Sequence, residues 1–517
     1  MRRKVHAFLF VLLLAGGVAQ AQVKDPVVEG IVKEANENSQ LEELAHELLD
    51  GIGPRLVGTP EMQKAHNWAV AKYKDWGIEA KNEQWGEWRG WQRGVTHVDM
   101  VHPRVQSLEA TQLAWSPGTK SKGVTAELVV LPDVQDSVAF QKWLPNVKGK
   151  LVMISMQQPT GRPDYNWEEF ATKESLAKMK EEREAQTEAF NENMKKTGYT
   201  SRTLPAALEK AGAAGVVTSN WSRGFGVNKI FGAYTKNIPS IDVALEDYGM
   251  LYRLVESGSK PQIRIQAESK KLKNAPTFNT VAQIKGTEKP EEYVVLSAHF
   301  DSWDGGTGAT DNGTGTIVMM EAMRILKKMY PNPKRTIIAG HWGSEEQGLN
   351  GSRAFVADHP EIVKNIQAVF NQDNGTGRVV NISGQGFLHA YDYLGRWLSA
   401  APREITSGIE TNFPGFPGGG GSDHASFVAA GAPAFMLSSL NWSYGTYTWH
   451  TNRDTYDKIV FDDVRNNAIL VAILAYKASE DPAMANRERI VLPVDSRTGE
   501  QRTWPEQREP TRKGGLD

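Results

Sequence analysis

The stretch from Tyr293 to Gly315 constrains the fold of this chain more than any other. It begins with an apolar run, Tyr293 to Ala298, whose β-branched residues predict a buried strand. His299 and Asp301 follow at the carboxyl end of that strand, which is the end at which α/β proteins bind ligands. We therefore expect the chemistry of the protein at this point.

A glycine-rich loop after the strand leads to a third polar side chain, Asp311. Residues 314–329 then predict a helix, which Pro331 ends. Imidazole nitrogen and carboxylate oxygen suit zinc, and the two oxygens of one aspartate can bridge two metal ions. A glycine-rich turn with incidental polar residues explains this segment equally well on its own. The remaining ligands must come from later strands.

Composition sets the class of protein. The chain has 517 residues, which favours more than one domain, and its 40% hydrophobic and 23% charged residues are typical of a globular protein. Its formal net charge of −2 gives no field that favours nucleic acid or an anionic membrane, so we expect neither as a partner. The chain has no cysteine, which excludes thiol catalysis and cysteine-ligated zinc. Any metal must be held by His, Asp and Glu.

Residues 1–21 have the layout of a secretory signal. They combine a basic start, an apolar core from Ala7 to Ala15 and the small-residue site Ala19-Gln20-Ala21, which predicts cleavage before Gln22. The alternative is a short membrane anchor, but the apolar core is too short to span a bilayer comfortably. We expect a secreted or periplasmic protein with no membrane span after signal cleavage.

Three later junctions supply further candidate ligands. A strand predicted at residues 336–341 ends in Glu345 and Glu346, and one at residues 368–371 ends in Asp373. Neighbouring side chains on extended backbone point in opposite directions, so one glutamate can face a metal while the other faces the substrate. Together the four junctions supply His299, Asp311, Glu346, Asp373 and His450.

With these residues in place, the chain resembles the exported di-zinc exopeptidases related to carboxypeptidase Q and the bacterial zinc aminopeptidases. The motifs that carry the resemblance are His299-Phe300-Asp301-Ser302-Trp303-Asp304, Gly308-Ala309-Thr310-Asp311-Asn312-Gly313, Glu345-Glu346-Gln347-Gly348-Leu349-Asn350-Gly351-Ser352, Ser422-Asp423-His424 and His450-Thr451-Asn452-Arg453-Asp454-Thr455. The resemblance includes Ile52-Gly53-Pro54-Arg55 near the start of the chain but not the tail.

The resemblance implies roles for individual residues. Asp311 bridges two Zn²⁺ ions, with His299 and Asp373 on one and Glu346 and His450 on the other. Glu345 is the general base, which takes a proton from a water shared by the metals to leave hydroxide, and Asp301 orients His299. The family often has a cis peptide bond after the bridging aspartate, so we expect one at Asp311–Asn312. His424 is expected near the site, beside the glycines at 418–421, with its role left open.

Two positions depart from the family pattern. Asn312 stands where carboxypeptidase Q relatives tend to have a second aspartate, and Trp449 stands where they have a histidine and some aminopeptidases a tyrosine. A tryptophan has no phenol to stabilise an oxyanion. That role therefore passes to Tyr444, Tyr447 or the metal itself.

The resemblance also implies the architecture. We expect an α/β zinc exopeptidase fold, a three-layer mainly parallel sheet with helices on both faces, and a smaller inserted α/β protease-associated domain. The expected segments are a signal peptide at 1–21, the N-terminal part of the peptidase domain at 22–120, the inserted domain at 121–270, the main peptidase part at 271–480 and a polar tail at 481–517. The tail is either an extended wrap or a disordered end.

The inserted domain is expected to supply no metal ligand but to roof the site in part. Within it, residues 167–196 predict a charged, solvated helix, with a lid or a homodimer contact as the alternatives.

The predicted function is that of an exported zinc metallo-exopeptidase, which hydrolyses terminal peptide bonds of short peptides or dipeptides. Whether it is carboxypeptidase Q-like or an aminopeptidase is open at this point. One alternative is a receptor-like relative without catalysis, which bound zinc would contradict. Another is a glutaminyl-cyclase-like acyltransferase, which would bind a single zinc ion.

Overall fold

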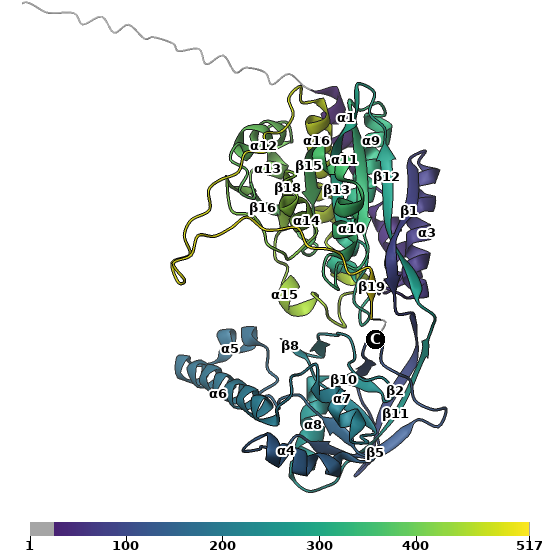
Figure 1. Cartoon of the computed structure of the whole chain (residues 1–517), viewed down its shortest axis with the longest axis vertical. Helices are drawn as coiled ribbons and strands as arrows, with labels where there is room; N and C mark the ends of the chain where they lie inside the picture. The colour runs from purple at the N-terminus through teal and green to yellow at the C-terminus, as the bar shows by residue number, and fades with distance from the viewer. Residues whose placement is uncertain (1–24, 516–517) are drawn as a thin grey trace, which may run out of the picture.

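Two β-sheets organise the computed structural model, which describes residues 25–515 (Figure 1). In Figure 1 the nine-stranded sheet and its helices occupy the upper part, and the eight-stranded sheet lies below with helices α4 to α8. The predicted secretory signal at 1–21 lies outside the described residues. Within residues 25–515, no helix is both long and apolar enough to cross a membrane.

The larger sheet is α/β in organisation, as predicted. Its four central strands, β18, β15, β13 and β14, are parallel, and antiparallel strands flank them. The strands predicted at 293–298, 336–341 and 368–371 lie inside β13, β14 and β15. The full order is β17 (Glu410–Asn412), β16 (Val379–Ser383), β18 (Ala434–Ser439), β15 (Ile366–Asn371), β13 (Lys289–His299), β14 (Arg335–Trp342), β12 (Ala275–Ile284), β1 (Glu79–Trp88) and β19 (Lys513–Gly514).

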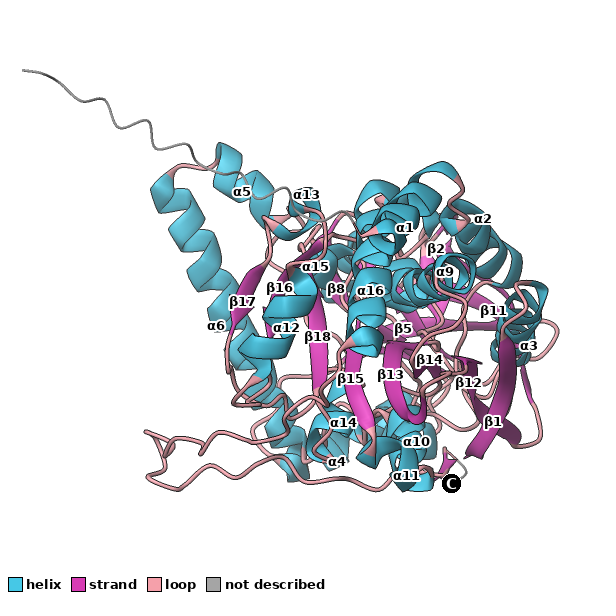
Figure 2. Ribbon diagram, turned by 90° about the horizontal axis from the view of Figure 1, so that it is seen from above, coloured by secondary structure: helices cyan, strands magenta, loops and turns pink. Residues whose placement is uncertain are grey.

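Helices cover both faces of this sheet, which confirms the predicted layers (Figure 2). One face carries α9 (Thr314–Met329), which has the predicted bounds, α16 (Phe461–Glu480), α1 (Pro26–Glu37) and α2 (Leu41–Ala45), and the other carries α10 (Asn350–Asp358), α11 (Pro360–Lys364) and α14 (His424–Ala429). Further helices of this part of the chain are η1 (His46–Ile52), α3 (Pro60–Asp75), α12 (Ala390–Leu398), α13 (Arg403–Thr406) and α15 (Tyr444–Tyr447).

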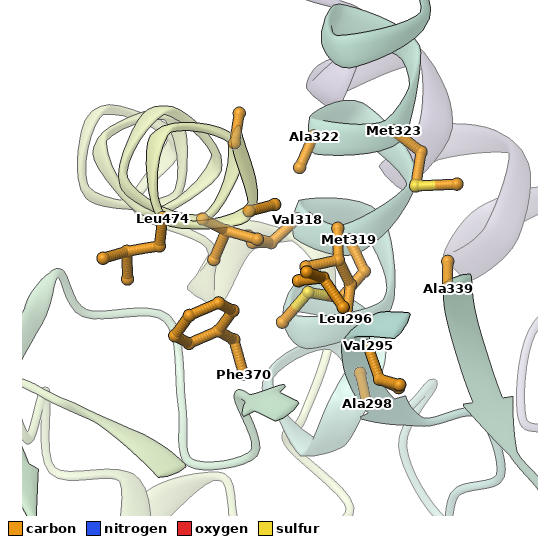
Figure 3. Close-up of a cluster of buried hydrophobic side chains, with 14 of the residues drawn as sticks. Val295, Leu296, Ala298, Val318, Met319, Ala322, Met323, Ala339, Phe370 and Leu474 are labelled. Atoms are coloured by element: carbon orange, nitrogen blue, oxygen red, sulfur yellow. The ribbon is translucent and has the colours of Figure 1, made fainter. Parts of the chain in front are cut away.

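The core explains why β13 reads as an unbroken apolar run. Because helices cover both of its faces, every residue of Val294–Ala298 is buried, and there is no polar alternation. Figure 3 shows Leu296 of β13 against Met319 of α9, with Phe370 of β15 and Leu474 of α16 beside them. All four side chains are fully buried, so the strand that ends in His299 is packed closely against α9 and α16.

The smaller sheet is built from strands that lie between β1 and β12 in sequence. Its order is β3 (Gln106–Ser107), β2 (Trp91–His102), β11 (Gln262–Lys271), β5 (Val124–Val130), β6 (Leu151–Met153), β7 (Gly215–Thr218), β10 (Ser240–Val243) and β4 (Ala110–Gln112). We call the part of the chain from Trp91 to Lys271 the second-sheet region. It includes β2, β3 and β4, which precede the predicted boundary at residue 121. Its assignment as an inserted protease-associated domain stays a prediction.

Helices and a short hairpin complete the second-sheet region. They are α4 (Ser137–Trp143), α5 (Asp164–Phe170), α6 (Lys173–Thr197), α7 (Leu204–Lys210), α8 (Leu245–Glu256), β8 (Trp221–Gly224) and β9 (Val227–Asn228). The charged helix predicted within residues 167–196 corresponds to the end of α5 and the 25 residues of α6.

The tail runs extended over the nine-stranded sheet as far as Gly515. Arg489 forms an isolated bridge with Phe387, and the indole of Trp504 donates to the carbonyl of Val428 at 3.1 Å. Strand β19 then pairs in parallel with β1. The described part of the tail is therefore a wrap along the nine-stranded sheet.

Candidate metal centre

The five predicted ligands meet at one edge of the nine-stranded sheet. His299 ends β13, Asp373 follows β15 by two residues, and Glu346 lies in the turn after β14. Asp311 lies in the turn before α9, and His450 follows α15. Because the central strands are parallel, their carboxyl ends bring these side chains together.

Asp311 lies between the two histidines. Its Oδ1 is 3.4 Å from Nε2 of His299, and its Oδ2 is 3.3 Å from Nε2 of His450. The carboxylate thus presents one oxygen to each imidazole. This is the arrangement that a bridging ligand requires.

Each histidine faces a second carboxylate on its other side. Nε2 of His299 is 2.9 Å from Oδ1 of Asp373, and Nε2 of His450 is 2.8 Å from Oε2 of Glu346. The ligand atoms form two groups, one of His299, Asp311 and Asp373 and one of Asp311, Glu346 and His450, with the atoms of each group within 4.8 Å of one another. The two groups share only Asp311.

The buried charges of this cluster suit cations. Oδ2 of Asp311 and Oε1 of Glu346 are buried and have no hydrogen-bond partner among the described residues. Burial, and then the charge of Asp311, raises the pKa of Glu346 well above its ordinary value. Bound cations would satisfy these oxygens and offset the repulsion between the carboxylates. The donor set of nitrogens and carboxylate oxygens fits zinc.

Asp301 organises both the histidine and the paired glutamates. Nδ1 of His299 lies 3.0 Å from the main-chain carbonyl of Asp301, whereas the Asp301 carboxylate is 3.7 Å away. The carboxylate instead accepts hydrogen bonds from the backbone N–H groups of Glu345 (2.9 Å) and Glu346 (3.2 Å). The main-chain carbonyl of Asp301 therefore orients His299, as expected of this residue. The Asp301 side chain fixes the turn that carries Glu345 and Glu346.

Arg55 holds the loop between His299 and Asp311, a role that the sequence did not reveal. Its buried guanidinium donates to the carbonyls of Phe300 (2.8 Å), Thr307 (2.8 Å) and Gly308 (2.9 Å). A Cβ on Gly308, whose φ is +63°, would lie 2.3 Å from Cβ of Ser302. Arginine and glycine together allow this loop to fold tightly. In the sequence, Arg55 stood out only as part of Ile52-Gly53-Pro54-Arg55, a glycine–proline stretch that the family resemblance includes.

Hydrogen bonds made by Asp454 and Asn312 fix the backbone around Asp311. The carboxylate of Asp454 accepts from the backbone N–H groups of Thr310 (2.8 Å) and Asp311 (3.0 Å). The amide of Asn312 donates to the carbonyl of Gln372 at 2.9 Å. The predicted cis peptide bond at Asp311–Asn312 is confirmed. Asn312, where relatives tend to have aspartate, therefore links the bridging turn to the end of β15.

Glu345 has the surroundings expected of a general base. The residue is half-buried, its backbone is fixed by Asp301, and its carboxylate accepts no hydrogen bond from any residue between 25 and 515. Burial raises its pKa well above the ordinary value, although His299 opposes that change. A buried carboxylate with a raised pKa is better able to hold a proton near neutral pH.

Of the two candidate tyrosines, Tyr444 lies at the metal centre and Tyr447 does not. Burial raises the pKa of Asp311, but its neighbours His299, His450 and Tyr444 bring it below its ordinary value. Tyr447 packs instead on Gly224, where an added Cβ would lie 2.7 Å from its ring. Trp449 stacks on His450 with ring centroids 4.1 Å apart.

His424 packs against the glycine run beside the site. A Cβ on Gly418 would lie 2.9 Å from Nε2 of His424. Burial lowers the pKa of His424 to about 4, so the ring is neutral near pH 7.

A cleft of about 1060 Å³ opens on Glu346 and His450, and residues of both sheets line it. Trp303 and Phe231 pack around His450, with ring centroids 6.1 and 5.4 Å from it. The backbone N–H of Ile230, in the second-sheet region, donates to the carbonyl of His450 at 2.8 Å. The second-sheet region thus forms one wall of the cleft and supplies neither group of candidate ligands.

The chain is similar to known peptidases. Residues 279–475 match the model of Peptidase family M28. Carboxypeptidase Q of Rattus norvegicus is 27% identical over 445 residues, 85% of each chain, and that of Homo sapiens is 26% identical over 452 residues, 87% of each chain.

Solved structures share the fold. A Peptidase M28 precursor from Shewanella amazonensis aligns with a TM-score of 0.65 and 21% identity, covering 93% of this chain and 98% of its own. A zinc aminopeptidase from Bacillus subtilis aligns with a TM-score of 0.55 and 20% identity, covering 88% of this chain and 97% of its own. Residues 279–475, which match the model of Peptidase family M28, carry all five candidate metal ligands.

Proposed function

We propose that this chain is a zinc metallo-exopeptidase that binds two Zn²⁺ ions and cleaves terminal peptide bonds of short peptides. The observation that carries the proposal is the position of Asp311, whose two oxygens face His299 and His450 separately. Asp311 would hold one ion together with His299 and Asp373 and another together with Glu346 and His450. The family match and the zinc aminopeptidase fold support the same reading.

The protein residues divide the work of hydrolysis. Zinc, when bound, supplies a Lewis acid that polarises the scissile carbonyl and lowers the pKa of the attacking water. Glu345 takes the proton of that water and returns it to the nitrogen of the leaving amine. Tyr444, a buried neighbour of Asp311, is the side chain placed to donate to the developing oxyanion.

Metal stoichiometry measured together with peptide hydrolysis tests this function. We expect close to two zinc ions per chain, and Asp311→Asn should lose most of both, because each group of ligands depends on that carboxylate. A control substitution, Asp392→Asn, changes an exposed aspartate of α12 and should keep both ions. One zinc ion in the unaltered protein would favour the single-metal acyltransferase, and none would favour the receptor-like alternative.

We also propose that the protein is exported. The support is the signal-like pattern of residues 1–21. Expression in a bacterial host should give a mature N-terminus at Gln22 in the periplasm or medium. An intact N-terminus in the cytoplasmic fraction would contradict export without affecting the proposed activity.

A further inference from the structure

Lys229 lies in the cleft wall next to His450, although it belongs to the second-sheet region. It directly follows β9, and it forms an isolated bridge with Thr451. Its Nζ lies 4.0 Å from the centre of the Trp449 ring, and that ring stacks on His450 at 4.1 Å, so the ammonium is within about 8 Å of the His450 ring. A cation is therefore fixed a short distance from the candidate metal centre.

The ammonium group of Lys229 keeps one donor free. Two of its three N–H groups donate to the carbonyls of Gly445 (3.1 Å) and Trp449 (3.0 Å). No carboxylate in the described part of the chain forms an ion pair with it, and the side chain is half-buried in the cleft wall. Because a half-buried cation with a free donor is stabilised by an anion, this position favours an anionic ligand group.

The other charges of the cleft favour the same kind of ligand. Arg89 and Arg202 also line it, and the one acidic residue among its described lining residues is Glu346, a candidate metal ligand. Arg89 lies with its guanidinium carbon 4.4 Å from the centre of the Trp115 ring. A peptide carboxylate that enters this cleft meets cations, whereas a peptide ammonium meets no carboxylate that is free to bind it.

We propose that Lys229 binds the C-terminal carboxylate of the substrate, so that the enzyme holds short peptides by their carboxyl end. The inference rests on the proposed function, because it takes the scissile bond to lie at the metal centre. An extended residue spans at most ~3.3–3.6 Å, so about 8 Å leaves room for one or two residues after the scissile bond. The substrates are then dipeptides and short peptides with a free carboxyl terminus.

The direct test measures binding in a protein that turns over slowly. In zinc-loaded Glu345→Gln protein, isothermal titration would compare Leu-Leu with its C-terminal amide and with N-acetyl-Leu-Leu. The amide should bind on the order of 10- to 100-fold more weakly than Leu-Leu, because it loses a charge-assisted hydrogen bond. N-acetylation should change the affinity little. When Lys229→Met is added to the Glu345→Gln protein, its affinity for Leu-Leu should fall to its affinity for the amide.

Two matched variants show whether the effect belongs to Lys229. Lys236→Met removes an exposed lysine of the same region and should leave the preference for the acid unchanged. Lys229→Arg keeps the charge and should restore part of the preference. If Arg89→Met removes the preference and Lys229→Met does not, the assignment to Lys229 is wrong.

Binding and hydrolysis separate this inference from the proposed function. Equal affinities for acid and amide would overturn the inference, even if the unaltered enzyme hydrolyses both. A large loss on N-acetylation instead would show that the enzyme binds the amino end of its substrate. Binding that depends on Lys229, in a protein that hydrolyses no peptide and binds no zinc, would overturn the proposed function and leave the carboxylate site standing.

Discussion

The sheet edge and the opposite wall of the cleft hold their functional side chains in different ways. At the edge, buried groups are fixed by several contacts each: Asp301 and Asp454 both accept two backbone N–H groups, and Arg55 donates to carbonyls along one loop. In the wall, Lys229 and Arg89 are half-buried and lie against tryptophan rings.

The difference indicates which task each surface suits. Metal ions need ligand atoms at fixed distances, and such precision comes from side chains locked by packing and multiple hydrogen bonds. The long side chains of Lys229 and Arg89 instead bring positive charge to the surface of the cleft, where an anionic group of a substrate can meet it. Substitutions at the edge should therefore change metal binding and catalysis, and substitutions in the wall should change substrate preference.

The largest effect is expected at Glu345. Glu345→Gln keeps the size of the side chain but removes the basic carboxylate, so kcat should fall by at least ~10²–10⁴-fold while zinc content stays unchanged.

Glu346→Gln is the matched control in the same turn. It should weaken one metal site, so that its activity follows zinc content and recovers in part with added zinc. Zinc analysis beside kcat decides between them. If Glu345→Gln loses zinc and Glu346→Gln keeps both ions, the two roles are reversed.

Asp301→Asn should lower zinc affinity by ~10- to 100-fold, the usual range for groups behind metal ligands. An asparagine can accept only one of the two N–H bonds from Glu345 and Glu346 well, because its amide NH₂ would face the other donor. Zinc titration against a chelator measures this effect. An unchanged affinity would show that the turn holds its shape without the carboxylate.

Arginine substitutions compare the two surfaces directly. Arg55→Lys should lower the free energy of unfolding by about 2 kcal/mol, because a lysine cannot donate to the separate carbonyls of Phe300, Thr307 and Gly308. Arg89→Lys loses mainly a ring contact, so its cost should stay below about 1 kcal/mol. Denaturant unfolding of zinc-free protein measures both, and equal costs would contradict the contrast between edge and wall.

The two regions should respond to acid with opposite signs. Behind the sheet edge, burial lowers the pKa of His66 to about 3. As pH falls, the unfolded chain therefore protonates this histidine before the folded protein does. The contribution of neutral His66 to stability is lost as pH falls from about 6.5 toward 3. In the second-sheet region, burial raises the pKa of Asp242 to about 6, so its contribution is fully present below about pH 4 and lost as pH rises through about 6.

Variants isolate these two contributions. His66→Leu should flatten the fall in unfolding midpoint on the acid side, and Asp242→Asn should remove a change of the opposite sign between pH 4 and 6. Both are measured with chelator present, so that zinc release does not contribute. Curves parallel to that of the unaltered protein would show that neither group carries the effect.

The sequence by itself predicted a metal centre and its location in the chain. An apolar run that ends in His299, and acids that follow two later strands, are local patterns, because burial on both faces of a parallel strand removes polar residues until the strand ends. Helix α9 was also predicted from local residues. The cis bond at Asp311–Asn312 was expected from the family resemblance of the motif around it. Such features depend on neighbours along the chain.

Only the tertiary structure decided how these residues face one another. The bonds from Arg55 to the loop after Phe300, the choice of Tyr444 over Tyr447, and the place of Lys229 beside His450 join positions far apart in sequence. They depend on how β13 packs and on how the second-sheet region meets the sheet edge. No periodicity along the chain encodes such contacts, because each is fixed by the packing of elements that local residues do not specify.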